Sequence, residues 1–202
     1  MRLDIDYTNH PRWNDLSKKH KETLTIPNLF ANILNEYKNQ IPNIDELNSA
    51  IETGTYDGKT STILANHFDV VFTIELFPDR NPYDQKNYRT LYEQLSDDHQ
   101  NLTFLFGSSE QIIPEILSEL PDERFMFLLD SHNNITSPLR EELKAIKEYS
   151  NNKSHVFLID DCNDLGSGNF PSENELKELL YSINPNYNFV KIDDGNKIML
   201  VY

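Results

Sequence analysis

The sequence predicts an α/β fold in which a seven-stranded, mostly parallel sheet carries helices on both faces. Apolar runs of strand length alternate with amphipathic stretches of helical length over residues 47–202, which is typical of a parallel sheet with crossover helices. The last two runs are separated only by DDGN, residues 193–196, which is too short for a parallel crossover and predicts an antiparallel C-terminal hairpin. A turn with two glycines follows the first run, as in Rossmann-like nucleotide-binding folds.

Each element follows from this alternation. The expected strands are 47–53, 70–74, 102–106, 125–129, 156–159, 188–192 and 197–201. The expected helices are 59–67, 83–95, 111–120, 139–149 and 173–183. Residues 1–46 precede the sheet and are expected to be a helical segment that acts as a lid. Residues 1–202 then form a single domain whose ligand-binding core is 47–202.

Length and charge limit the possible functions. A chain of 202 residues with 38% hydrophobic content can bury one full core and is short for two enzyme domains. Its formal net charge of -15 disfavours nucleic acid, which is bound through clustered Lys and Arg, and favours a small neutral or cationic ligand. The single cysteine, Cys162, excludes an intrachain disulfide framework, and no stretch approaches membrane-spanning length. We therefore expect a soluble, cytoplasmic protein without a nucleic-acid or membrane partner.

The glycine turn lies in IETGTYDGKTSTILANHFDVVFTIELFP, residues 51–78. Gly54 and Gly58 allow the backbone to turn tightly and to approach a ligand at the helix N-terminus. Glu75 ends the next strand, where a carboxylate can accept both hydroxyls of a ribose, and Glu52 adds a carboxylate beside the turn. The alternative is a tight turn without a ligand and a solvent-exposed Glu75. The spacing E-x-G-x-x-x-G differs from the G-x-G-x-x-G that binds NAD.

Acidic residues also end the fourth and fifth expected strands. Asp130 closes FMFLLD, and Asp160 with Asp161 closes VFLIDD. If these strands are neighbours, the three carboxylates converge at the carboxyl edge of the sheet, where ligands bind in open α/β folds. Oxygen ligands of this kind select Mg²⁺, Mn²⁺ or Ca²⁺. The alternative is solvated strand-end aspartates without a metal.

Five segments in order resemble the motifs of one enzyme family. IETGTYDGKTS, FTIELFP, FGSSEQIIPEI, FMFLLDSHN and VFLIDD are similar to successive motifs of the class I S-adenosylmethionine (SAM)-dependent O-methyltransferases. The pattern most resembles the metal-dependent catechol type and a related bacterial and viral group associated with glycan modification. The resemblance covers roughly residues 47–202, and an antiparallel hairpin at the end of the sheet is expected for this class. It implies methyl transfer from SAM to a hydroxyl of a small molecule or sugar, with Mg²⁺ or Mn²⁺.

The resemblance also implies which residues contact the cofactor. Glu52 would lie near the SAM ammonium group, and Glu75 would hold the ribose. Ser108 and Ser109 match the segment that borders the adenine, with Ser109 as the hydrogen-bond partner or, alternatively, an ordinary helix N-cap. The turn that wraps the methionine part of SAM would comprise Gly54, Tyr56, Gly58 and Thr60.

The implied metal ligands are Asp130, which also borders the cofactor, Asp160 and Asp161, although the family has Asp-Asn in place of the last two. A bound ion would lower the pKa of the acceptor hydroxyl and align it with the sulfonium methyl group. The family's general-base lysine falls at Asn133, which leaves His132 as the nearest titratable group. His132 could instead be a metal ligand or a loop residue.

Two features of the sequence bear on turnover and on the acceptor. Asn133 in place of the lysine favours an alternative function, a SAM-binding module or partner subunit without turnover. The aromatic residues Trp13, Phe30 and Tyr37, together with the loop 163–172, are expected to frame the acceptor pocket. Their mixture of aromatic, Asn and Ser side chains suits a sugar as well as a phenol.

Overall fold

The computed structural model describes residues 32–76, 82–131, 137–151, 153–192 and 197–202. Seven strands form one sheet. They are β1 (Ser49–Thr53), β2 (Val70–Glu75), β3 (Leu102–Phe106), β4 (Phe125–Leu129), β5 (Val156–Ile159), β6 (Phe189–Ile192) and β7 (Ile198–Val201). The strand order is β3-β2-β1-β4-β5-β7-β6. Strands β1 to β5 are parallel, and β7 is antiparallel to both β5 and β6, which confirms the predicted mostly parallel sheet with an antiparallel hairpin.

The direction of the strand order changes between β1 and β4. Strands β2 and β3 follow on one side of β1, whereas β4 and β5 follow on the other. The last residue of β1, Thr53, is in register with Ile74 of β2 and with Leu129 of β4, so these strands end at the same level. Their carboxyl ends form the sheet edge at which open α/β folds bind ligands.

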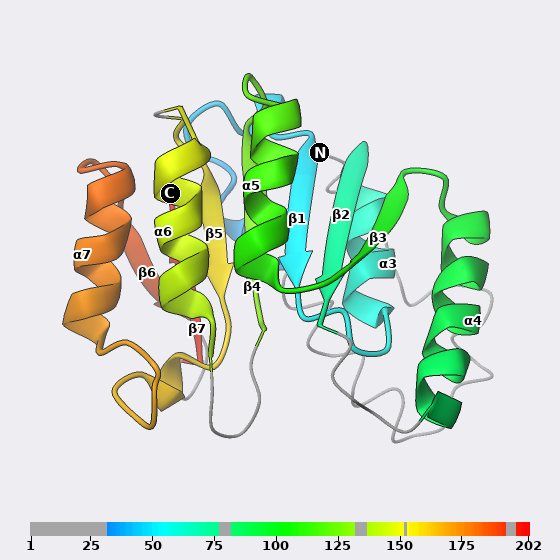
Figure 1. Ribbon diagram of the computed structural model, residues 1–202. Coiled ribbons are helices and arrows are strands. Elements are labelled where there is room, and N and C mark those ends of the chain that lie inside the picture. Colours follow the sequence, from blue (N-terminus) through cyan, green and yellow to red (C-terminus); the bar gives the residue numbers. More distant parts are fainter. Residues whose placement is uncertain (1–31, 77–81, 132–136, 152, 193–196) are drawn as a thin grey trace.

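Helices cover both faces of the sheet, as predicted. The main helices are α3 (Lys59–His67), α4 (Pro82–Asp98), α5 (Ser109–Glu119), α6 (Leu139–Tyr149) and α7 (Glu173–Ile183). Figure 1 shows α5, α6 and α7 side by side on one face, α3 on the opposite face, and α4 beside the edge strand β3. Two short 3-10 helices lie at Ile44–Glu46 and Cys162–Asp164.

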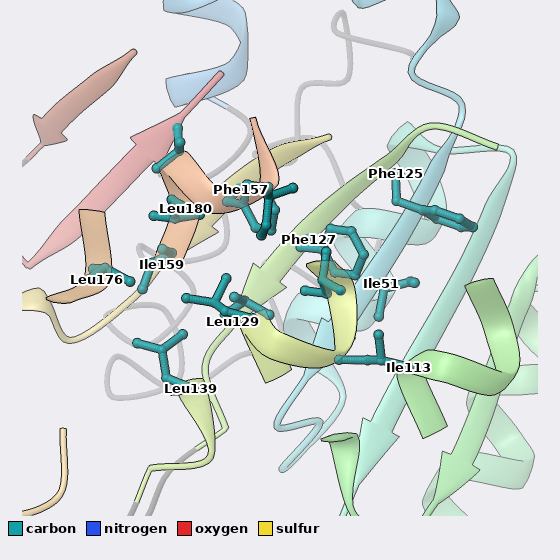
Figure 2. Close-up of a cluster of buried hydrophobic side chains, with 14 of the residues drawn as sticks. Ile51, Ile113, Phe125, Phe127, Leu129, Leu139, Phe157, Ile159, Leu176 and Leu180 are labelled. Atoms are coloured by element: carbon teal, nitrogen blue, oxygen red, sulfur yellow. The ribbon is translucent and has the colours of Figure 1, made fainter. Parts of the chain in front are cut away.

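Each face of the sheet has its own hydrophobic core. On the face covered by α5, α6 and α7, Ile51, Phe127 and Phe157 pack together, with the last two rings stacked at a centroid distance of 5.3 Å (Figure 2). Ala50 points to the other face, where it joins the cluster beneath α3. Strands β4 and β5 are buried along their whole length because their side chains belong alternately to the two cores, with Phe127 in one and Leu128 in the other.

The element boundaries agree closely with the sequence prediction. Helices α3, α6 and α7 and strands β3, β4 and β5 have the predicted limits. Helix α4 extends three residues further at its C-terminal end, to Asp98, and α5 begins at Ser109 because Ser108 is its N-cap. The predicted hairpin turn, 193–196, lies outside the described residues.

Only part of the N-terminal segment is described. Residues 32–37 are helical, and Tyr37 packs against the hydrophobic core on the α3 face. Trp13 and Phe30 lie outside the described residues, so the acceptor lid stays a prediction. No helix in the described ranges is long and apolar enough to cross a membrane.

Candidate functional site

The glycine turn lies at the carboxyl end of β1 and begins the site. Gly54 has a φ of +88°, and a Cβ at this position would overlap the carbonyl oxygen of Asp130 at the end of β4. Gly58 has a φ of +72°, and its Cβ would lie 2.5 Å from the Cδ1 atom of Leu95 on α4. Gly54 is therefore required by a close contact with backbone as well as by its conformation, whereas Gly58 is required mainly by its positive φ, because the end of the Leu95 side chain can move aside. The ligand approach expected at the turn stays a prediction.

Glu52 lies beneath this turn and is almost completely buried. Its Oε2 atom accepts hydrogen bonds from the hydroxyls of Ser61 and Thr73, the latter at 2.6 Å. Burial raises the pKa of Glu52 to about 7, although the two hydroxyls lower it. The carboxyl group thus joins α3 to β2, and its predicted proximity to the SAM ammonium group is untested.

Glu75 is brought directly to the turn. Its Oε2 atom accepts a hydrogen bond of 2.8 Å from the backbone N–H of Tyr56. Tyr56 has a φ of 46°, and its carbonyl oxygen accepts a hydrogen bond of 2.6 Å from the hydroxyl of Tyr92. The structure therefore joins two of the predicted cofactor-binding residues, Tyr56 and Glu75. Thr60 lies in the first turn of α3, half-buried.

Ser109 is the first residue of α5. Its hydroxyl is buried and donates a hydrogen bond of 2.6 Å to Oε1 of Glu142. The N-cap of α5 is Ser108, so the alternative interpretation of Ser109 as an N-cap is wrong. This hydrogen bond joins Ser109 to a residue of α6. The adenine contact assigned to Ser109 stays a prediction.

The three strand-end aspartates line one small pocket. Asp130, Asp160 and Asp161 surround it together with Glu142 and Phe170. The pairing of β4 with β5 brings them together, since Leu129 is in register with Ile159 and the N–H of Asp160 donates to the carbonyl of Leu129. The predicted convergence of these acids at the carboxyl edge is therefore present in the fold.

The pocket is strongly acidic. Burial raises the pKa of Asp130 to about 8, and the nearby carboxylates of Asp160, Glu52 and Asp161 raise it further. Burial likewise raises the pKa of Glu142 to about 7, against the lowering effect of its hydrogen bonds. Two acids of this pocket therefore take up protons near neutral pH, which a bound cation would oppose.

Carboxylate oxygens suit a hard divalent cation in their chemistry. Among the residues that the structure describes, however, no three His, Cys, Asp or Glu side chains are grouped so that they could hold a metal ion. The metal-ligand roles of Asp130, Asp160 and Asp161 thus stay predictions. His132, the candidate base, and Asn133 lie outside the described residues.

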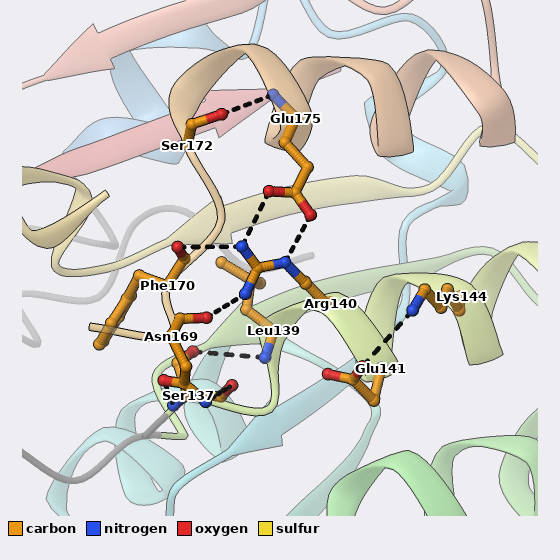
Figure 3. Close-up of polar contacts among 9 residues, drawn as sticks. All are labelled: Ser137, Leu139, Arg140, Glu141, Lys144, Asn169, Phe170, Ser172 and Glu175. Carbon is orange, nitrogen blue, oxygen red and sulfur yellow. Dashed lines mark hydrogen bonds and ion pairs between the residues drawn. The ribbon is translucent and has the colours of Figure 1, made fainter. Parts of the chain in front are cut away.

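Hydrogen bonds hold the loop that follows β5, residues 163–172, against the start of α6 (Figure 3). Arg140 of α6 donates hydrogen bonds to the carbonyls of Asn169 and Phe170 and to both carboxylate oxygens of Glu175, at 2.5 and 2.8 Å. The side chain of Asn169 accepts a hydrogen bond of 2.8 Å from the N–H of Ser137. These contacts hold Phe170 at the wall of the pocket, and the role of the loop in framing an acceptor stays a prediction.

The sequence analysis did not identify Glu142 and Tyr92 as residues at or beside the candidate site. A signal for Glu142 was present, since it occupies a position on the apolar face of α6 between Leu139 and Leu143. An acid at such a position is buried and must be paired within the protein. Tyr92 had no comparable signal, because an aromatic residue on a predicted helix is ordinarily part of the core.

Comparisons with known proteins bear on the fold. No protein-family model matches the sequence, and no curated protein matches it. The SAH-bound methyltransferase PaMTH1 of Podospora anserina superposes with a TM-score of 0.55 at 10% identity, over 96% of this chain and 82% of that chain. A protein of Klebsiella pneumoniae described as a candidate O-methyltransferase gives 0.54 at 13% identity, over 93% and 81%.

A third structure is a candidate O-methyltransferase of Nostoc punctiforme, with a TM-score of 0.52 at 11% identity, over 100% of this chain and 63% of that chain. At such identities the likeness concerns the fold. The strand order, the antiparallel hairpin and the glycine turn at the carboxyl edge agree with it. The chain has the fold of the class I SAM-dependent methyltransferases.

Proposed function

We propose that this protein is a SAM-dependent O-methyltransferase whose acceptor is a hydroxyl of a small molecule or sugar. One observation supports it above the others: Glu75, at the end of β2, is held against the glycine turn by the N–H of Tyr56 at 2.8 Å. In a class I methyltransferase fold, this carboxylate lies where a nucleoside ribose is recognised. The structural neighbour from Podospora anserina is SAH-bound, which supports SAM as the cofactor.

The turn and Glu75 would share the binding of SAM. A carboxylate can accept several hydrogen bonds, so its bond from Tyr56 is compatible with ribose hydroxyls. The bond also fixes the orientation of the carboxylate before the ligand arrives, which reduces the entropy lost on binding. The net charge of -15 further suits a sulfonium cation better than an anionic ligand.

The acceptor would enter beside the pocket at the ends of β4 and β5. The pKa of Asp130 is raised to about 8, so its carboxylate form is a base strong enough to take a proton near neutral pH. The wall that holds Phe170 would orient an apolar or sugar ring next to this acid. His132 is the other candidate base, and replacement of each residue by a neutral one distinguishes them.

A divalent ion, Mg²⁺ or Mn²⁺, is part of the proposal as an accessory to this pocket. Asp130, Asp160 and Asp161 would hold it, and the ion would supply positive charge that lowers the pKa of the acceptor hydroxyl. Chelation by EDTA separates the two forms of the proposal. Activity that survives exhaustive chelation would leave the proton transfer to Asp130 or His132.

The test begins with calorimetric titration of SAH into the wild type and into Glu75→Ala. We expect the wild type to bind and the variant to bind about 1.5 to 3 kcal/mol more weakly, the range for a lost hydrogen bond to a charged group. Labelled methyl transfer is then measured on glycosides, catechols, RNA and proteins. Binding of SAH without transfer to any acceptor would favour the alternative function, a SAM-binding module, and labelling of RNA alone would contradict the proposed acceptor.

A further inference from the structure

Tyr92 lies outside the strand ends that the proposed function uses. It belongs to α4, which packs beside the edge strand β3 (Figure 1), and its side chain is 2% exposed. Its ring stacks on Phe104 at a centroid distance of 4.6 Å and an interplanar angle of 8°, and on Phe106 at 5.9 Å and 26°. These two contacts fix the ring, so the direction of its hydroxyl is fixed as well.

The hydroxyl of Tyr92 donates a hydrogen bond of 2.6 Å to the carbonyl oxygen of Tyr56 in the glycine turn. Tyr56 has a left-handed backbone with a φ of 46°, a conformation that is unfavourable for residues other than glycine. Its own side chain is 63% exposed and adds little packing. Both peptide groups of Tyr56 are held by hydrogen bonds to side chains.

The N–H of Tyr56 makes the second of these bonds, to Oε2 of Glu75. Tyr56 thus links the hydroxyl of Tyr92 on one side to the carboxylate of Glu75 on the other. Leu95, three residues after Tyr92 on the same helix, packs against Gly58, where a Cβ atom would lie 2.5 Å from its Cδ1 atom. Helix α4 consequently contacts the turn at two points, and one of them leads to the predicted ribose site.

We propose that Tyr92 is a positioning residue for SAM binding, an inference that rests on the proposed function. Its hydroxyl holds Tyr56 so that the Tyr56 N–H orients the Glu75 carboxylate toward the ribose hydroxyls. Tyr92 acts through Tyr56 and Glu75. Loss of the Tyr92 hydroxyl therefore weakens nucleoside binding, because the Glu75 carboxylate is no longer held in the orientation that binds the ribose.

Tyr92→Phe tests this directly, because it removes the hydroxyl and keeps the ring that stacks on Phe104 and Phe106. We expect SAH, titrated calorimetrically, to bind about 3- to 10-fold more weakly, the range for a lost neutral hydrogen bond. The control is Tyr187→Phe, which removes another buried tyrosine hydroxyl, on a ring that packs edge-to-face against Phe157. The control should bind SAH within about twofold of the wild type.

A double-mutant cycle with Glu75→Ala, which removes the acceptor of the Tyr56 N–H, separates positioning from a general structural effect. If Tyr92 acts through Glu75, adding Tyr92→Phe to Glu75→Ala should weaken SAH binding by less than about twofold. An equal loss in both backgrounds would overturn the inference, as would Tyr92→Phe binding SAH as tightly as the wild type. A wild type that fails to bind SAH would instead contradict the proposed function, and this inference with it.

Discussion

Ser109 and Glu142 form a buried hydrogen bond between two helices that follow different strands, with 2.6 Å between Oγ and Oε1. Ser109 begins α5, after β3, and Glu142 lies in the first turn of α6, after β4. Glu142 also lines the pocket that Asp130 lines. Glu142 therefore combines a hydrogen bond between two helices with a raised pKa.

Glu142→Gln should change how stability depends on pH. The folded-state pKa of Glu142, about 7, lies above its ordinary value of 4.5, so its contribution is present below pH 4.5 and is lost as pH rises through 7. Gln keeps an acceptor for Ser109 and carries no charge. Relative to the wild type, the variant should gain free energy of unfolding between about pH 5 and pH 8, on the order of 1 to 3 kcal/mol.

Urea unfolding at several pH values measures this difference, and the comparison with the wild type cancels the opposite trend from His155, whose pKa burial lowers to about 3. Glu148→Gln, which removes an exposed carboxylate from the same helix, is the control. Parallel curves for wild type and Glu142→Gln would show that Glu142 does not titrate in this range.

Gly54→Ala should destabilise the protein by about 3 to 5 kcal/mol, because the new Cβ would overlap the carbonyl oxygen of Asp130, a fixed backbone atom. Gly166→Ala is the matched control. Gly166 has a similar φ of +84°, and a Cβ added there would meet no atom within 4 Å, so only the backbone cost of about 1 to 2 kcal/mol applies. Equal losses of unfolding free energy would mean that the contact with Asp130 is not limiting.

Mg²⁺ should raise the melting temperature of the wild type if the acidic pocket binds it. At a concentration about 100-fold above its dissociation constant, the expected gain of about 2.7 kcal/mol corresponds to a rise of about 5 to 10 °C. Asp130→Asn should remove the rise, whereas Asp122→Asn, at a fully exposed residue, should keep it. A wild type whose melting temperature ignores Mg²⁺ and Mn²⁺ would contradict the metal site.

Arg140→Lys should loosen the loop after β5. A lysine cannot reach the carbonyls of Asn169 and Phe170 and both oxygens of Glu175 at once, since it lacks the planar fork of arginine. Limited proteolysis should cut residues 163–172 faster in this variant. Lys144→Ala, which removes an exposed ion pair with Glu141, should leave the cleavage rate unchanged, because such pairs contribute little.

The helices and strands follow from local patterns in the sequence. Strand β4 has the predicted limits because five consecutive apolar residues bounded by Arg124 and Asp130 can form only a short buried element. The antiparallel hairpin follows from the length of its connection, since four residues cannot carry a chain back to a parallel start. The acids at the ends of β4 and β5 were predicted to meet, because parallel neighbours end at one edge.

The partners of individual side chains were decided by the tertiary structure. Ser109 and Glu142 are 33 residues apart, and Tyr92 and Tyr56 are 36 apart. Whether such residues touch depends on how helices pack onto a twisted sheet, which no local pattern records. The sequence determined that glycine is needed at position 54, yet only the packing of β1 beside β4 shows that the carbonyl of Asp130 takes up the space of its side chain.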